Sequence, residues 1–137
     1  MKQLTKAEEE IMQILWQLQE GNVASLIDEM PEPKPAYNTV STIVRILESK
    51  GFVDHRQQGK GYIYFPIVDK ETYSNQSINQ LMNNYFNGSF KSMVSFFMKK
   101  NDLKTTDLES ILKEINKDNK WWTNIYWKLY YFSWHSF

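Results

Sequence analysis

The sequence predicts a mainly α-helical chain with one small β-hairpin, an α+β fold. Two patterns predict it. Apolar residues recur at intervals of three and four over most of the chain, which is typical of helices with one buried face. Between residues 52 and 68 the pattern changes to alternation on both sides of a glycine-containing turn, which is typical of a hairpin. The expected parts are 1–68, a helical region at 69–120 and an aromatic-rich tail at 121–137.

Two helices are expected before residue 31. Thr5 and Glu8 have the spacing of a capping box, so the first helix is expected to begin after Thr5. Its buried face would be formed by Ala7, Ile11, Ile14, Leu15 and Leu18. Gly21 is expected to end this helix, and Asn22 to cap a short second one. The three prolines in 31–35 cannot continue a helix and predict a stiff connector.

A third helix is expected over 37–50, with Val40, Val44 and Leu47 on one apolar stripe and Gly51 as its C-cap. Strands at 52–57 and 62–68 would follow, joined by a turn that holds two glycines. Three helices followed by a hairpin is the order of a winged helix-turn-helix, with its wing at 53–68. We therefore expect this fold over residues 1–68.

The region from 69 to 120 is expected to hold three more helices, separated at 87–89 and 101–102. This region is too short and too apolar on one side to stand alone, and a symmetric homodimer is the commonest way to cover such a side. The expected dimerisation residues are Tyr73, Ile78, Leu81, Tyr85, Phe86, Phe90, Val94, Phe97, Leu108, Ile111, Leu112 and Ile115.

The composition excludes several classes of function. The absence of cysteine excludes disulfides, thiolate metal sites and cysteine catalysis. His55 and His135 are isolated in the sequence, and consecutive Glu8, Glu9 and Glu10 would spread around a helix instead of pairing. We expect no enzyme, no metal and no cofactor, with His55 as a surface or wing residue. Neither a secretory signal nor a membrane-spanning run is visible, so a cytoplasmic location is expected.

The net charge is zero, but the charges are unevenly distributed. Residues 1–32 carry two lysines and seven acids, a net of −5, whereas 33–62 carry five basic residues and two acids, a net of +3. A DNA-facing surface would therefore lie in the second block. A scattered, solvated surface is the alternative on charge alone.

The third helix is the candidate recognition element. Its exposed side would carry Arg45, which can pair bidentately with guanine, and Asn38, which can pair with adenine. Polar residues at the hairpin tip suit contacts with the phosphate backbone. The expected DNA-binding residues are Lys34, Tyr37, Asn38, Thr39, Ser41, Thr42, Arg45, Arg56, Gln58 and Lys60. The alternatives are an ordinary amphipathic surface helix and a polar tip of the kind that any hairpin has.

Five segments together resemble the penicillinase repressor family, the regulators of β-lactamase and methicillin resistance. They are 4–16, 36–43, 47–53, 62–66 and 85–90, so the resemblance covers residues 1 to about 118. It implies a transcriptional repressor that binds palindromic, double-stranded operator DNA as a homodimer, with helix 37–50 in the major groove and the wing on the backbone. The alternative is a winged-helix module for protein–protein interaction without sequence-specific DNA binding.

The resemblance also bears on regulation. In relatives, a membrane-bound sensor protease cuts the repressor at an Asn–Phe bond, so it implies a regulatory protease as a candidate partner. That bond aligns with Phe96–Phe97 here, where asparagine is absent. Copper-responsive relatives carry a C-terminal cysteine cluster that this chain lacks. The tail 121–137 would add packing across the dimer or touch a membrane surface, and its single Lys128 disfavours stable membrane association.

Overall fold

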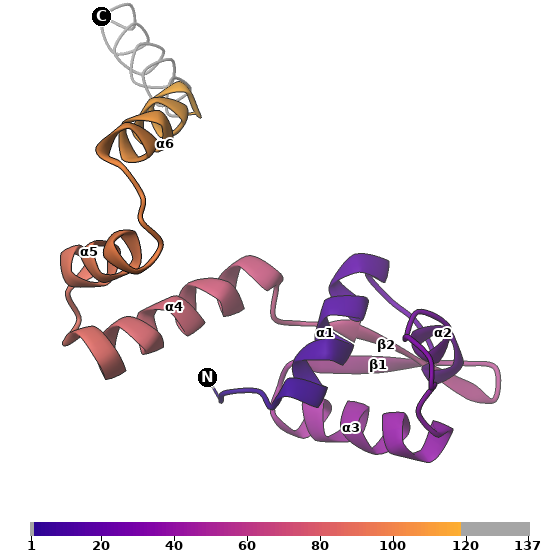
Figure 1. Cartoon of the computed structure of the whole chain (residues 1–137). Helices are drawn as coiled ribbons and strands as arrows, with labels where there is room; N and C mark the ends of the chain where they lie inside the picture. The colour runs from indigo at the N-terminus through magenta and orange to yellow at the C-terminus, as the bar shows by residue number, and fades with distance from the viewer. Residues whose placement is uncertain (1, 119–137) are drawn as a thin grey trace, which may run out of the picture. The chain divides into compact units, whose positions relative to one another are not determined.

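The computed structural model describes residues 2–118, and Figure 1 shows the order of the elements along the chain. These residues form six helices and two strands: α1 (Lys6–Leu18), α2 (Val23–Asp28), α3 (Tyr37–Ser49), β1 (Val53–Gln58), β2 (Gly61–Pro66), α4 (Lys70–Phe86), α5 (Phe90–Lys100) and α6 (Thr105–Asp118). The chain divides after Tyr85 into two compact units. The predicted mainly helical fold with one antiparallel hairpin is confirmed.

Helix α1 begins as the sequence predicts. The Thr5 side chain accepts a hydrogen bond from the Glu8 amide at 3.3 Å, and the Glu8 carboxylate accepts one from the Thr5 amide at 3.0 Å. The helix ends at Leu18, earlier than expected, and the next residue, Gln19, takes a positive φ of 71°. The prediction that Gly21 ends the helix was wrong. A residue with a side chain rarely adopts a positive φ, so the sequence did not indicate that the helix would end before Gln19.

Gly21 instead pairs with the wing. Its amide donates to the Tyr64 carbonyl, and the Tyr64 amide donates back to the Gly21 carbonyl, both at 2.9 Å. A Cβ at Gly21 would lie 2.7 Å from the Ser25 hydroxyl oxygen. A larger residue here would force the Ser25 side chain to rotate and to give up the hydrogen bond that its hydroxyl donates to the Asn22 carbonyl at 2.8 Å. The bridge fastens β2 to the link between α1 and α2, next to the Asn22 cap of α2.

The core of the first unit lies between α1, α2, α3 and the base of the hairpin (Figure 1). Its most deeply buried side chains are Ile11, Met12, Leu15, Leu26, Val40, Val44, Leu47, Phe52 and Val53. The predicted stripe of α3 is among them. Ala7 is exposed, contrary to expectation, because the inward positions of the first turn are taken by Leu4 and Glu8.

The hairpin is regular. β1 and β2 pair antiparallel from Val53 opposite Pro66 to Gln58 opposite Gly61. Gly59 takes the positive φ, 61°, that the two-residue turn needs. The strands are shifted slightly from the expected bounds, since β1 reaches Gln58 and β2 ends at Pro66.

Tyr73, at the start of α4, lies in the core of the first unit and not on a surface open to a partner. It is 7% exposed, and its ring packs edge-on against Phe52 with centroids 5.6 Å apart. Its hydroxyl accepts from the Leu4 amide and donates to the Glu9 carboxylate, at 3.4 and 2.7 Å. Burial and the bond to Glu9 raise the pKa of Tyr73. We therefore remove Tyr73 from the expected dimerisation residues.

The second unit contains α5 and α6. Ser89 caps α5 by accepting from the Ser92 amide at 3.1 Å, and the breaks fall at the predicted positions, with positive φ at Asn87 and Asp102. No described side chain from 86 to 117 is buried. That 69–120 acts as one dimerisation region stays a prediction. No helix within 2–118 is long and apolar enough to cross a membrane, and the tail 121–137 lies outside the described residues.

Candidate nucleic-acid interface

Helix α3 has one buried and one polar face. The apolar stripe points into the core, while Asn38, Thr42, Arg45 and Ser49 are exposed and Ser41 is half-buried. The hydroxyls of Thr42 and Ser49 each donate to the carbonyl four residues earlier, at 2.8 and 3.1 Å, and keep their oxygen lone pairs outward. The N-cap, Ala36, provides no side-chain cap, so the first amides of α3 remain suited to a phosphate.

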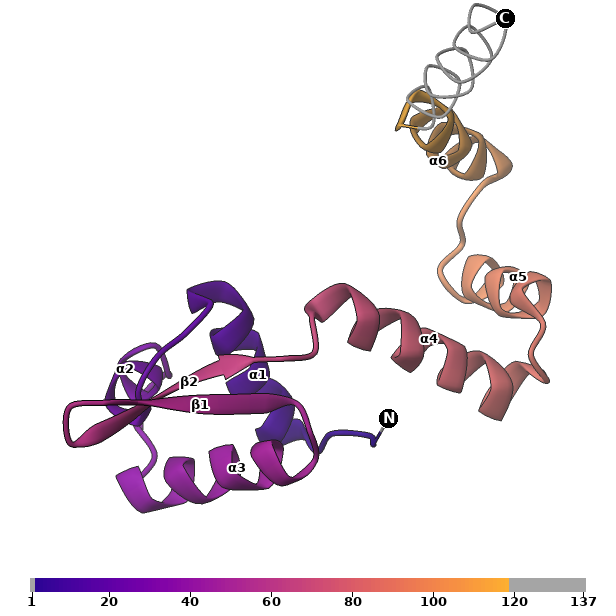
Figure 2. The same ribbon diagram turned by 180° about the vertical axis from the view of Figure 1, so that it is seen from behind.

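A groove of about 410 Å³ joins α3 to the wing and to the start of α2. The tip of the hairpin and the N-terminal ends of α2 and α3 lie at the same end of the first unit in both views (Figure 1, Figure 2). The groove is lined by Asn22, Val23, Ala24, Tyr37, Asn38, Ser41, Arg45, Lys60, Gly61, Tyr62 and Tyr64. The structure thus brings five predicted DNA-binding residues to one place: Tyr37, Asn38, Ser41, Arg45 and Lys60.

Two tyrosines of β2 complete the groove and were missed in the sequence. Tyr62 is 48% exposed, while Tyr64 is buried. Burial and the Glu48 charge raise the pKa of Tyr64, and the positive charge of the nearby Arg45 opposes this rise. Arg45 and Tyr64 therefore lie close together in the lining of the groove. The alternating pattern at 62–66 predicts that these residues form a strand, but it does not tell which face of the hairpin lies against a helix. The sequence therefore could not place the two tyrosines in the groove.

Lys34 has a structural role. Its ammonium donates to the carbonyls of Ile27, Asp28 and Met30 at 3.1–3.2 Å, and so stabilises the C-terminal end of α2 as a cation at the negative end of a helix. Lys34 is still exposed. Its ammonium group already donates hydrogen bonds to carbonyls of the protein, and the sequence did not indicate these bonds.

Arg56 is paired with Glu20, in the link between α1 and α2. Their closest atoms, Arg56 Nη1 and Glu20 Oε2, are 2.6 Å apart, and both side chains are about half exposed. The hydrogen bond from Arg56 lowers the pKa of Glu20, and the same bond raises that of Arg56. The remaining predicted residues, Thr39, Thr42 and Gln58, are exposed but do not line the groove.

Lys50 is the third basic residue with an internal partner. Its ammonium lies 2.7 Å from a carboxylate oxygen of Glu8, which is buried. Burial alone would raise the pKa of Glu8, but the hydrogen bonds and charge of Lys50 and the bonds of Thr5 outweigh it and lower the pKa. Of the basic residues in 33–62, Arg45 and Lys60 are the two that line the groove.

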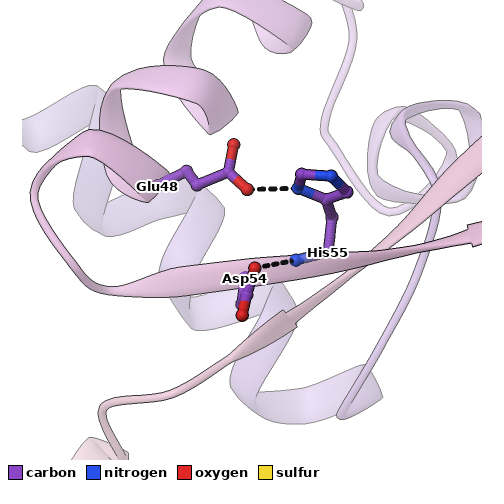
Figure 3. A group of neighbouring side chains, drawn as sticks. All are labelled: Glu48, Asp54 and His55. Atoms are coloured by element: carbon purple, nitrogen blue, oxygen red, sulfur yellow. Dashed lines mark hydrogen bonds and ion pairs between the residues drawn. The ribbon is translucent and has the colours of Figure 1, made fainter.

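A separate cluster lies at the other end of α3, where Glu48, Asp54 and His55 meet (Figure 3). His55 Nδ1 contacts Glu48 Oε1, and the His55 amide donates to Asp54 Oδ1 at 2.8 Å. One ligand atom from each side chain lies within 4.8 Å of the other two. Within 2–118, these three side chains form a group whose potential ligand atoms lie close enough together to hold a metal ion.

The expected dimerisation residues other than Tyr73 lie on α4, α5 and α6. Ile78, Leu81, Tyr85, Phe90, Phe97, Ile111, Leu112 and Ile115 are exposed, while Phe86, Val94 and Leu108 are half-buried. On α6, the side chains of Ile111, Leu112 and Ile115 are each about half exposed. Such apolar side chains along helices are typical of surfaces that a partner covers.

Comparison with known proteins gives a consistent result. The family model of the penicillinase repressor matches residues 4–117. The methicillin resistance regulatory protein MecI of Staphylococcus aureus (strain N315) is 27% identical over 116 residues, which cover 84% of this chain and 94% of MecI. The penicillinase repressor of Bacillus licheniformis is 28% identical over 116 residues, which cover 82% of this chain and 91% of that protein.

Two solved structures are also similar. The solution structure of the DNA-binding domain of the repressor BlaI is 28% identical and covers 52% of this chain and 88% of its own, with a TM-score of 0.46. The Bacillus licheniformis BlaI monomeric form in complex with the blaP half-operator is 27% identical, with a TM-score of 0.45, and covers 53% of this chain and 89% of its own.

Proposed function

This chain belongs to the penicillinase repressor family, and from that membership we propose that it is a transcriptional repressor that binds operator DNA as a homodimer. The observation that carries the proposal is the groove in which Asn38, Ser41 and Arg45 of α3 lie beside Lys60 of the wing. A protein–protein module would not need polar side chains that read base edges next to a cation suited to phosphate. Family membership favours the repressor over that alternative.

In this proposal α3 lies in the major groove of the operator. Asn38 and Ser41, near its N-terminal end, contact base edges, as do residues near the start of other recognition helices. Arg45 pairs with a guanine, beside Tyr64 in the lining of the groove. Lys60, at the wing tip, contacts a phosphate and positions the protein without reading sequence.

The homodimer is supported by the exposed apolar side chains of α4, α5 and α6. Because none of the described residues from 86 to 117 is buried, α5 and α6 have no core of their own within one chain. Two copies related by a two-fold axis would read the two halves of a palindromic operator. The place of action would be the cytoplasm, where the operator DNA lies.

The same proposal includes a regulatory protease that cuts this chain. Phe96 and Phe97, at the aligned bond, are 53% and 58% exposed, but both lie inside α5. Cleavage there would require α5 to open locally, since a protease needs an extended backbone. Cleavage at this bond stays a prediction.

A gel-shift titration tests the proposal. The full chain would be titrated onto DNA from upstream of its own gene, with random DNA as competitor and at two salt concentrations. We expect tight, competitor-resistant binding in multiples of a dimer that weakens with salt. Weak binding that the competitor removes would contradict the expectation that the operator lies upstream of the protein's own gene. The search would then turn to a distant operator or to a protein partner.

Two variants separate the proposed roles. Arg45→Ala should weaken operator binding by about 1–3 kcal/mol and reduce the preference over random DNA, whereas Lys60→Ala should weaken both DNAs alike and flatten the salt dependence. Lys6→Ala removes an exposed lysine of α1 and is the matched control. If Arg45→Ala and Lys60→Ala lost affinity equally on both DNAs, the assignment of roles would be wrong.

A further inference from the structure

The cluster of Glu48, Asp54 and His55 combines side chains from two elements (Figure 3). Glu48 lies in the last turn of α3, while Asp54 and His55 belong to β1. The imidazole and the Glu48 carboxylate point toward each other, and Asp54 lies beside them on the strand. We propose that these three side chains form a binding site for a divalent cation of the zinc type.

The donor set suits such an ion. Zinc accepts imidazole nitrogen and carboxylate oxygen, and a site with three protein ligands leaves a position for water. Donor atoms bound to one tetrahedral zinc at about 2.1 Å stand about 3.4 Å apart. The three atoms here already lie within 4.8 Å of one another, so side-chain rotations of modest size would complete the site.

Neighbouring groups hold two of the ligands in place. The His55 ring packs edge-on against Tyr62, with centroids 4.8 Å apart, and lies 5.9 Å from Tyr64. The Asp54 carboxylate is held by the His55 amide through Oδ1, and Oδ2 takes no part in that bond. Asp54 and His55 are exposed and Glu48 is half-buried, so an ion can enter from solvent and retain water ligands.

Charge gives an independent reason for a cation. Glu48 places a carboxylate at the C-terminal end of α3, where the helix dipole is negative, and the last turn of α3 contains no basic residue. Asp54 adds a second carboxylate a short distance away. A divalent ion would neutralise both and would also interact favourably with the helix end. It would tie the end of α3 to the base of the wing.

Calorimetric titration of the full chain with Zn²⁺, after treatment with a chelator, tests the site without any DNA. We expect one ion per chain. His55→Ala and Glu48→Gln should each weaken binding by at least about tenfold, the loss that follows even when an outer partner of a metal ligand is removed. Circular dichroism of both variants checks that they remain folded.

Two matched controls accompany these variants. His135→Ala removes the other histidine of the sequence, and Glu10→Gln removes an exposed carboxylate of α1. Both should bind Zn²⁺ as the unaltered chain does. Absence of binding to the unaltered chain at millimolar Zn²⁺, or affinity that depends on His135 and not on His55, would overturn the proposal. Because no DNA is present, either result leaves the repressor function untouched.

Discussion

The ion pair between Glu20 and Arg56 predicts that removing an acid will strengthen DNA binding. Arg56 lies on β1, within the wing, but its guanidinium is bound to a Glu20 carboxylate 2.6 Å away. The change is Glu20→Gln, which keeps the shape of the side chain and removes its charge. Both side chains are about half exposed, so Arg56 can turn to a phosphate once the carboxylate is gone.

The size of the effect follows from counterion release. Each additional phosphate contact steepens the slope of log affinity against log salt by about 0.9, or about 1.8 for two protomers on one operator. The gain of Glu20→Gln over the unaltered chain should therefore be about sevenfold larger at 50 mM salt than at 150 mM. Fluorescence anisotropy on operator and random duplexes at several salt concentrations measures both slopes.

Two controls isolate Arg56 from a general change in charge. Glu10→Gln removes an exposed acid of α1 instead and should leave the slope nearly unchanged. In an Arg56→Gln background, Glu20→Gln has no guanidinium to release and should have no effect on the slope. If the slope steepened equally in that background, the gain would come from long-range charge and the reasoning about Arg56 would be refuted.

Three further predictions concern stability and assembly. Lys50→Met leaves the buried Glu8 carboxylate unpaired and should lower the free energy of unfolding by about 1–3 kcal/mol, less than for a fully buried pair because Lys50 is 21% exposed. The Glu8 pKa is lowered in the folded state, so this contribution is present above pH 4.5 and is lost as the pH falls through the folded pKa; urea unfolding at neutral and acidic pH should show the deficit shrinking in acid. Gly21→Ala places a Cβ 2.7 Å from the Ser25 hydroxyl oxygen, which must rotate and lose its bond to the Asn22 carbonyl, so the change should cost about 0.5–1.5 kcal/mol in thermal unfolding; in a Ser25→Ala background it should cost little, and an equal cost there would contradict the clash. Ile115→Glu charges a side chain that is 48% exposed, so sedimentation should show monomers with unchanged circular dichroism, and a persistent dimer would count against the α6 surface.

The sequence predicted the parts of the fold that local signals determine. The capping box at Thr5 and the cap at Asn22 each depend on a few neighbouring residues, and both are found. Gly51 was expected to be the C-cap of α3; the cap is Lys50, and Gly51 follows it with a positive φ of 82°. The exposed polar face of α3 followed from its period in the same way. What the sequence did not predict depends on residues far apart. Tyr73 bonds to Leu4, 69 positions away, which no local pattern indicates.

The candidate site shows the same limit. Its helix residues were predicted because the exposed face of an amphipathic helix can be identified from its period. Tyr62 and Tyr64 could not be predicted in this way, because their place in the groove depends on the register of the hairpin and on which of its faces lies against α3. Arg56 was predicted as a DNA contact from its place near a turn. Its partner Glu20 is 36 positions away in another element, so the sequence could not show that its charge is shared.

These pairs explain how a chain of zero net charge can carry a DNA-binding surface. Two acids of the N-terminal block are used internally: Glu8 pairs with Lys50, and Glu20 pairs with Arg56. The block that looked repulsive to DNA therefore holds cations of the basic block in place, and Arg45 and Lys60 remain at the groove. With so few cations at the groove, nonspecific attraction to the backbone should be weak and its salt dependence shallow. Discrimination must then come mainly from base contacts of α3, which is why Arg45 and Asn38 should matter more for operator preference than any change in total charge.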